Sequence, residues 1–249
     1  RTTGVPAPVV LFADTFNRYF EPENLRAAIR VLRAAGYDVF APKPAAGRPY
    51  CCGRTYLSAG MVDKARAEAE RLVTALYPLA RSGVRIVGLE PSCTLALRDE
   101  VPALLGTAQA EAVAEATLTF AELIEADRPD LPMSAEADGR PVKLHGHCHQ
   151  KAFDLVKPAE AVLRDIAGAE VEVIETSCCG MAGAFGYGRD TYDVSIHMAE
   201  ASLLPAVRAA PDEAAIVADG TSCRCQIGDG TGREAVHLAR HLDRLISGS

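Results

Sequence analysis

Two patterns of hydrophobic and polar residues alternate along the chain: short apolar runs typical of buried strands, and longer segments with the periodicity of amphipathic helices. The apolar runs predict strands within residues 9–17, 36–53, 84–93, 142–150, 168–180 and 214–223. The helical periodicity predicts helices over Glu23–Gly36, Met61–Leu79, Ala159–Ile166, Tyr192–Arg208 and Glu234–Leu245. Strands that alternate with helices form parallel sheets, because a parallel pair needs a crossover connection. The pattern therefore predicts an α/β fold.

The strand pattern occurs twice. Val9–Asn17 aligns without gaps on Val142–Gln150, a segment ending in Cys-Cys-Gly occurs in both halves, and so does a strand that leads to a single cysteine. We expect two pseudo-symmetric repeats, residues 1–124 and residues 142–249, each a small parallel sheet with flanking helices and with cysteines at the carboxyl ends of its strands. Residues 125–141, rich in Pro, Asp and Glu, are the expected linker.

Composition narrows the class of protein. The 249 residues are 49% hydrophobic and 24% charged, which excludes disorder. No apolar run reaches the roughly 18 to 20 residues that span a bilayer, and no signal segment opens the chain, so we expect a cytoplasmic protein. With 26 Lys and Arg against 33 Asp and Glu and a net charge of −7, we expect no nucleic-acid partner. The first residue is Arg rather than Met, as expected for part of a longer polypeptide.

The candidate chemistry lies in eight cysteines, all of which the pattern places in loops at strand ends. Ligands of open α/β sheets bind beyond the carboxyl ends of the strands. Single cysteines often fill a core, but eight at equivalent loop ends argue against that reading. Disulfides are rare in the cytosol, and adjacent cysteines form strained bridges. Thiolates that converge from several loops suit zinc or an iron–sulfur cluster, and the absence of Cys-x-x-Cys pairs favours the cluster. Thiol–disulfide redox chemistry remains a further alternative.

Several strings carry a resemblance to a known family. The sequences DTFNRYFEPENLRAAIRVL, CCGRTYLSAG, GLEPSCTLALRDE, LHGHCHQKA, SCCGMAGAFGY and VADGTSCR resemble the cysteine-rich CCG domain. That domain occurs twice in one of the subunits of heterodisulfide reductase, in the iron–sulfur subunit of glycolate oxidase and in related lactate-utilisation and glycerol-3-phosphate dehydrogenase subunits. The strings are also similar to the C-terminal part of fused FAD-linked oxidases that act on D-2-hydroxy acids.

The resemblance implies an oxidoreductase component: an iron–sulfur electron-transfer module of a flavin-dependent 2-hydroxy-acid dehydrogenase, of the D-2-hydroxyglutarate or D-lactate type. It implies a cluster of the 4Fe–4S kind, with FAD in the parent protein and not on this chain. The implied partners are FAD-binding dehydrogenase and ferredoxin-like domains and an electron acceptor such as a quinone, with attachment at the membrane periphery through them. The alternative is a structural or regulatory zinc-binding domain without electron transfer.

The two repeats differ in their candidate metal ligands. The second repeat offers four thiolates and is the better site: Cys148, Cys178, Cys179 and Cys223. The first repeat offers only three, Cys51, Cys52 and Cys93, because Thr15 aligns with Cys148. Cys225 is a possible fifth ligand of the second site. No catalytic residue is predicted.

Other residues near the second repeat's cysteines are candidates to contact the cofactor. Gly180 is expected to allow close approach of the backbone to a cluster. His147 and His149, in an alternating set with His145, could ligate metal, relay protons or cap the strand end. The charged residues Arg54, Glu90, Arg98, Asp99, Glu100 and Asp219 could orient a substrate carboxylate or form helix caps and surface ion pairs, and the sequence leaves both open.

Overall fold

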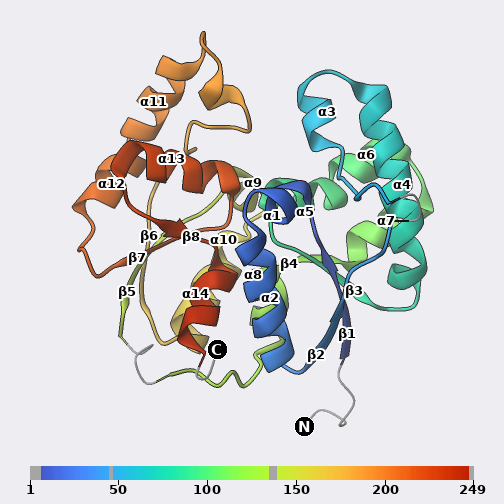
Figure 1. Ribbon diagram of the computed structural model, residues 1–249, viewed down its shortest axis with the longest axis horizontal. Coiled ribbons are helices and arrows are strands. Elements are labelled where there is room, and N and C mark those ends of the chain that lie inside the picture. The colour runs from blue at the N-terminus through green and yellow to red at the C-terminus, as the bar shows by residue number, and fades with distance from the viewer. Residues whose placement is uncertain (1–6, 45–46, 135–138, 247–249) are drawn as a thin grey trace. The chain divides into compact units, whose positions relative to one another are not determined.

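The computed structural model describes residues 7–44, 47–134 and 139–246. The chain divides into two compact units, residues 1–131 and 132–249 (Figure 1). Each unit contains a sheet of four parallel strands with helices around it. The prediction of an α/β fold built from two repeats, each a parallel sheet with flanking helices, is confirmed.

In the first unit the strands follow the order β2-β1-β3-β4. Their bounds are β1 Ala7–Phe12, β2 Tyr37–Phe40, β3 Arg85–Gly88 and β4 Thr117–Thr119. The helices are α1 Thr15–Tyr19, α2 Pro22–Ala34, α3 Arg54–Ser58, α4 Val62–Arg81, α5 Pro91–Arg98, α6 Glu100–Leu105, α7 Ala108–Ala116 and α8 Phe120–Asp127. Leu72 and Leu76 of α4 pack with Val10 and Ile86 of the sheet in one hydrophobic core.

In the second unit the strands follow the equivalent order, β6-β5-β7-β8. Their bounds are β5 Pro141–His145, β6 Glu170–Val173, β7 Ala215–Ala218 and β8 Ala235–Val236. The helices are α9 Cys148–Ala152, α10 Val156–Ala161, α11 Tyr192–Glu200, α12 Leu203–Ala209, α13 Thr221–Thr231 and α14 Leu238–Leu245, with a π-helical turn η2 over Val162–Ile166 and a 3-10 turn η3 over Phe185–Tyr187. Cys179 and Cys223 belong to the hydrophobic core of this unit.

Strand register confirms the repeat residue by residue. Val9 of β1 lies opposite Val39 of β2, and Val142 of β5 lies opposite Val171 of β6. On the other side, Val9 faces Arg85 of β3 and Val142 faces Ala215 of β7. These are the pairs that the gapless sequence alignment equates, so the two sheets are built in one register.

Each sheet has a fourth strand that the sequence pattern does not reveal. β4 has three residues and β8 has two, too short for any alternation to be read. The helix expected over Glu234–Leu245 therefore begins only at Leu238, after β8. The helix expected over Tyr192–Arg208 is two helices, α11 and α12.

The expected linker, residues 125–141, is partly regular structure. Helix α8 extends to Asp127, and β5 begins at Pro141. Met133 pairs with Ile246, and the boundary between the two compact units falls after Leu131. Residues 135–138 of the expected linker lie outside the described residues. In the described part of the chain, no helix has both the length and the apolar character needed to cross a bilayer.

Candidate metal centre

Four cysteines of the second unit lie at the carboxyl ends of three neighbouring strands, β6, β5 and β7. Cys148 is the first residue of α9, just after β5, and Cys223 lies in the first turn of α13, just after β7. Cys178 and Cys179 lie in the loop after β6. The expectation that all cysteines lie in loops is therefore wrong for those that lie in helices: Cys93, Cys148, Cys223 and Cys225.

The four thiols form a continuous set of side-chain contacts. The thiol of Cys148 donates to Cys178, and the thiol of Cys179 lies between Cys178 and Cys223 and interacts with both. Cys179 is 4% exposed and Cys223 1%, whereas Cys148 and Cys178 are half-buried. The fold thus brings the four sulfur atoms to one edge of the sheet. That they bind a metal together stays a prediction.

Negative charge in this site is favoured on two of the four sulfurs. The hydrogen bond from Cys148 holds the pKa of Cys178 far below its usual value, with Cys179 acting in the same direction. The hydrogen bond from Cys179 likewise lowers the pKa of Cys223 against the effect of burial, and His145 and His147 add to it. The pKa of Cys148 and of Cys179 is raised, since each donates to a neighbour. Thiolates, the form that binds metal, are thus stabilised here.

The backbone at Gly180 fixes the cysteine loop. Its N–H donates to the sulfur of Cys178 at 3.4 Å. Its φ is +85°, a left-handed value, and a Cβ at this position would lie 2.2 Å from the carbonyl oxygen of Ser195 on α11. Only glycine combines this φ with this contact. The equivalent Gly53 in the first unit has φ +82° and approaches Ala65 of α4 in the same way.

Two histidines lie near the thiols: His145 is the last residue of β5, and His147 follows it. His147 is the N-cap of α9: its Nδ1 accepts from the N–H of His149 at 3.1 Å and lies 3.9 Å from the sulfur of Cys148. His145 lies 3.4 Å by Nδ1 from Thr176 Oγ1, and its interaction with Cys223 lowers the pKa of that thiol. The ring of His149 meets that of His147 edge-on, at 5.2 Å between centroids. Of the roles that the sequence leaves open for these histidines, capping is the one that the structure displays, at His147, and a role toward a metal stays a prediction.

A buried carboxylate ties α9 to the rest of the unit. Asp219, after β7, accepts from the side-chain amide of Gln150 at 2.9 Å and from the N–H of Leu238 at 3.1 Å. His237 Nε2 lies 3.5 Å from the same carboxylate. Gln150 in turn accepts from the N–H of His147 at 3.0 Å. Asp219 thus positions the helix that begins with Cys148, a role that spacing in the sequence does not show.

Cys225 is directed away from the other thiols. It follows Cys223 by two residues on α13, and residues two apart do not share a helix face. Its side chain hydrogen-bonds Tyr187 of η3. Its place on α13 and its contact with Tyr187 argue against the role of fifth ligand, which stays an untested prediction.

The first unit gathers fewer thiols in a more acidic setting. Cys51 donates to Cys52 and accepts from the hydroxyl of Thr15, and Cys52 donates to Cys93. Donation to Cys52 and burial raise the pKa of Cys51. The hydrogen bond with Cys52 lowers the pKa of Cys93, but burial and the negative charges of Asp14 and Glu90 outweigh it and raise the value to about 11. This set favours neutral thiols.

Most of the charged residues near the cysteines of the first unit have structural partners. Glu90 caps α5 by accepting from the N–H and hydroxyl of Ser92. Arg98 pairs with Glu122 at 2.8 Å, and Arg54 pairs with Glu100. Of the two interpretations that the sequence leaves open for these residues, the structure provides direct support for helix caps and ion pairs.

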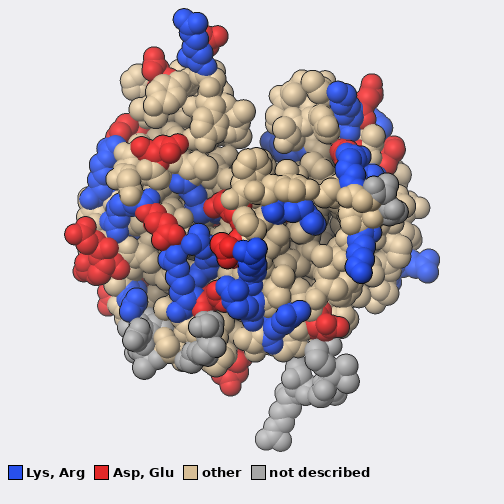
Figure 2. Space-filling model, in the orientation of Figure 1, with Lys and Arg blue, Asp and Glu red and all other residues tan. Residues whose placement is uncertain are grey.

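The surface that follows Gly180 carries exposed apolar side chains: Phe185, Tyr187, Tyr192, Val194 and Met198. These belong to η3 and α11, and the face over α11 is mostly uncharged in the space-filling view (Figure 2). The cysteine loop therefore borders an apolar surface.

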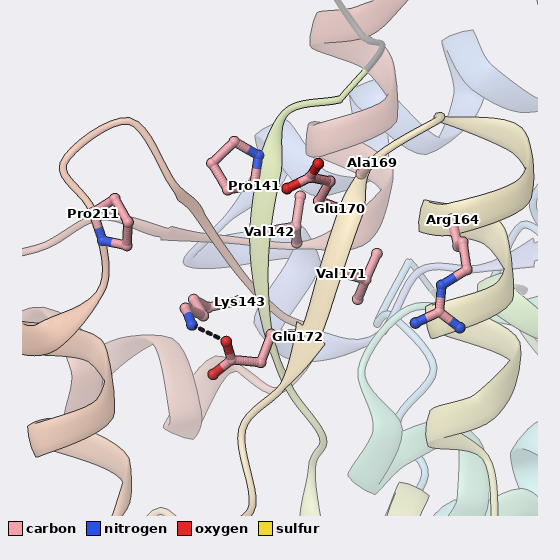
Figure 3. Close-up of a pocket in the computed structure, with 9 residues that line it drawn as sticks. All are labelled: Pro141, Val142, Lys143, Arg164, Ala169, Glu170, Val171, Glu172 and Pro211. Carbon is pink, nitrogen blue, oxygen red and sulfur yellow. Dashed lines mark hydrogen bonds and ion pairs between the residues drawn. The ribbon is translucent and has the colours of Figure 1, made fainter.

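A separate pocket lies beside β5 and β6, where Lys143 pairs with Glu172 (Figure 3). None of the residues that line it is a cysteine or a histidine.

All eight cysteines are free thiols. In the parts of the chain that are described, no three His, Cys, Asp or Glu side chains are placed around a point where a single metal ion could bind.

Comparison with known proteins identifies the first of the two units. Residues 12–98, which include Cys51, Cys52 and Cys93, match the model of the cysteine-rich domain CCG. This segment is a CCG domain. The second unit repeats the CCG order of strands and cysteines in the same register, with the leading cysteine present.

Relatives of the whole chain are oxidoreductases. It is 27% identical over 247 residues to one of the subunits of the anaerobic glycerol-3-phosphate dehydrogenase of Escherichia coli (strain K12), covering 96% of this chain and 59% of the relative. It is 31% identical over 232 residues to the D-2-hydroxyglutarate dehydrogenase of Pseudomonas putida, covering 92% of this chain and 21% of the relative. The Escherichia coli D-2-hydroxyglutarate dehydrogenase is 26% identical over 244 residues, 96% of this chain and 22% of the relative. The chain thus spans about three fifths of the first relative and one fifth of the others.

Proposed function

We propose that the second unit binds one iron–sulfur cluster, of the 4Fe–4S type, through Cys148, Cys178, Cys179 and Cys223, and that the chain is an electron-transfer module. The observation that carries this proposal is the row of four thiols at three neighbouring strand ends, in which each thiol interacts with the next. Cysteine thiolates are the usual ligands of such clusters.

The surroundings of the four sulfurs fit such a group in three ways. The lowered pKa values of Cys178 and Cys223 favour the anionic form that binds iron at two of the four proposed ligands. The N–H of Gly180 donates to a ligand sulfur, an interaction that tunes cluster potentials. Burial of Cys179 and Cys223 excludes water. When bound, the cluster would supply the capacity to accept and release one electron, and the chain's residues would hold it and set its potential.

The relatives indicate the setting of this electron transfer. Their names describe dehydrogenases of D-2-hydroxyglutarate and of glycerol-3-phosphate, reactions that remove electrons from a hydroxyl-bearing carbon. We place this chain in a flavin-dependent dehydrogenase of 2-hydroxy acids, of the D-2-hydroxyglutarate or D-lactate type. FAD would be held by a partner domain or subunit, electrons would reach the chain through ferredoxin-like clusters, and a quinone or similar acceptor would take them. Such partners would bring the chain to the membrane periphery.

In the first unit, we propose that Cys51, Cys52 and Cys93 do not hold a complete cluster. Thr15 occupies the position of the fourth ligand, and the pKa of each of the three thiols is raised. The proposal therefore differs from one in which each of the two units binds a cluster and transfers electrons.

The test is anaerobic reconstitution of the chain with iron and sulfide, followed by analysis of iron, zinc and acid-labile sulfide. The variants are Cys148→Ser and Cys179→Ser in the proposed site, Cys52→Ser in the first unit, and Cys225→Ser as the matched control on α13. We expect stoichiometric iron and sulfide in the wild type, Cys52→Ser and Cys225→Ser, and their loss in the other two.

Other outcomes would replace the proposal. Equal iron loss in Cys52→Ser would mean that both units share the centre. Stoichiometric zinc without sulfide would make the chain a structural or regulatory zinc protein. A chain without metal, whose thiols titrate reversibly in pairs, would indicate thiol–disulfide chemistry. Absence of reversible bleaching with dithionite would contradict the electron-transfer role even if iron were bound.

A further inference from the structure

Lys151 links the two segments that carry Cys148 and Cys178. It lies on α9, three residues after Cys148, and its Nζ donates to the carbonyl oxygen of Thr176 at 2.5 Å and to that residue's hydroxyl at 3.0 Å. The carbonyl oxygen of Ser177 lies 3.4 Å from the same Nζ. Thr176 and Ser177 directly precede Cys178, so one ammonium group holds the start of the cysteine loop against the helix that begins with Cys148.

The side chain of Lys151 packs closely against the backbone at Gly146. A Cβ on Gly146 would lie 3.3 Å from Lys151 Cε and 2.5 Å from a methyl group of Val156. Burial lowers the pKa of Lys151, and electrostatic interaction with all four cysteines of the site opposes this effect. The ammonium group is therefore half-buried and interacts electrostatically with the four thiols, and such interactions are screened less there than at the surface.

The first unit holds its cysteine loop differently. The residue aligned with Thr176 is Pro49, whose carbonyl oxygen accepts from Arg71 of α4 at 2.5 Å. The residue aligned with Lys151 is Arg18, whose buried Nε has no hydrogen-bond partner among the described residues. In the second unit, which has the leading cysteine, the cation on the helix of that cysteine is bonded to the cysteine loop. In the first unit, which lacks this cysteine, the loop is instead bonded to a cation of α4.

We propose that Lys151 is the positioning residue of the proposed cluster site: it keeps Cys148 and the Cys178–Cys179 loop in register and places a fixed positive charge beside the cluster. This inference rests on the proposed function. Because reduction adds negative charge to a cluster, an adjacent cation favours the reduced state and raises the reduction potential. The effect is additional to that of the N–H donor at Gly180.

The test compares Lys151→Met, Lys151→Arg and Lys157→Met in the full chain. Lys157 is the matched control, because it carries the same charge in the same unit but pairs with Asp154 on the surface, with 73% of each side chain exposed. The midpoint potential of the reconstituted chain is measured by EPR-monitored titration, with iron and sulfide determined on each sample. Hydrogen exchange of residues 174–180 is measured on the metal-free chain.

We expect a more negative potential in Lys151→Met than in Lys157→Met, with Lys151→Arg close to the wild type, and faster exchange of residues 174–180 in Lys151→Met alone. Iron loss in Lys151→Met that Lys151→Arg restores would also support the positioning role. Equal potentials and equal exchange in the two Met variants would overturn it. A wild type without iron and sulfide would refute the proposed function, while hydrogen exchange would still decide whether Lys151 holds the loop.

Discussion

Thr15 and Cys148 occupy the same position in two copies of one fold. Each is the first residue of the helix after the first strand of its unit, and each hydrogen-bonds the first cysteine of the Cys-Cys-Gly loop, Cys51 or Cys178. Because the first unit has a hydroxyl where the second has a thiol, it holds three thiols and the second unit holds four.

Replacing that oxygen tests whether Thr15 limits the first unit. In Thr15→Cys, the backbone already places a side chain against Cys51, so we expect iron and sulfide per chain to rise above the wild-type value after anaerobic reconstitution. Thr74→Cys, on the exposed side of α4, adds a thiol away from the site and serves as the control. Iron in Thr15→Cys equal to that in Thr74→Cys would contradict the account.

Gly180 is expected to be costly to replace because two penalties act there. Gly180→Ala forces a Cβ to within 2.2 Å of the Ser195 carbonyl oxygen at a φ of +85°. Gly183→Ala has only the penalty of the left-handed backbone, since its φ is +66° and nothing lies within 4 Å of the added Cβ. We expect Gly183→Ala to lower the free energy of unfolding by about 1 kcal/mol and Gly180→Ala by roughly 3 kcal/mol or more, measured by urea denaturation. Equal losses would show that the contact with Ser195 is relieved at no cost.

Asp219 should stabilise the second unit through the hydrogen bonds that its carboxylate accepts from Gln150 and Leu238. In Asp219→Asn an amide nitrogen would face Gln150 or Leu238, leaving a buried donor unsatisfied. The expected loss is about 1 to 3 kcal/mol in the free energy of unfolding. Asp212→Asn, at an exposed position, provides the control in the same denaturation experiment. A variant as stable as Asp212→Asn would mean that Asp219 does not anchor α9.

His241 of α14 should make stability depend on pH. Burial, with the charges of Arg244 and Arg140, lowers the pKa of His241 to about 4. Because the unfolded chain has a value near 6.5, unfolding takes up a proton between these limits, and stability falls as pH decreases through that window. The expected loss is roughly 3 kcal/mol between pH 6.5 and pH 4.

The measurement for His241 is the free energy of unfolding across that pH range in the wild type, His241→Gln and His197→Gln. His197, exposed on α11, is the control. We expect the slope to be smaller in His241→Gln than in the other two. A slope unchanged in His241→Gln would assign the pH dependence to other groups.

Much of this fold follows from the sequence. The gapless alignment of Val9–Asn17 with Val142–Gln150 corresponds to the observed strand register because buried parallel strands are continuous apolar runs that are easily recognised. Strands β4 and β8 are not predicted because strands of three and two residues carry no pattern. Their pairing with β3 and β7 depends on tertiary contacts.

The candidate site could be predicted only in part. Cysteine spacing after the strands indicates which thiols approach one another, because parallel strands end at one edge of a sheet. It does not indicate Lys151, Gln150 or Asp219, whose roles depend on contacts 25 to 69 residues away along the chain. The sequence places Cys225 in a loop rather than on α13 because the helix begins at Thr221 after Gly220, which has no side chain to signal a helix start.

The central claim is that four thiols of the second unit, with Cys148 as the leading ligand, hold one iron–sulfur cluster. The most direct measurement is iron and acid-labile sulfide per chain in anaerobically reconstituted wild type, Cys148→Ser and Cys225→Ser. We predict equal, stoichiometric iron and sulfide in the wild type and Cys225→Ser and their loss in Cys148→Ser. Iron and sulfide retained in full by Cys148→Ser, or absent from the wild type, would contradict the account.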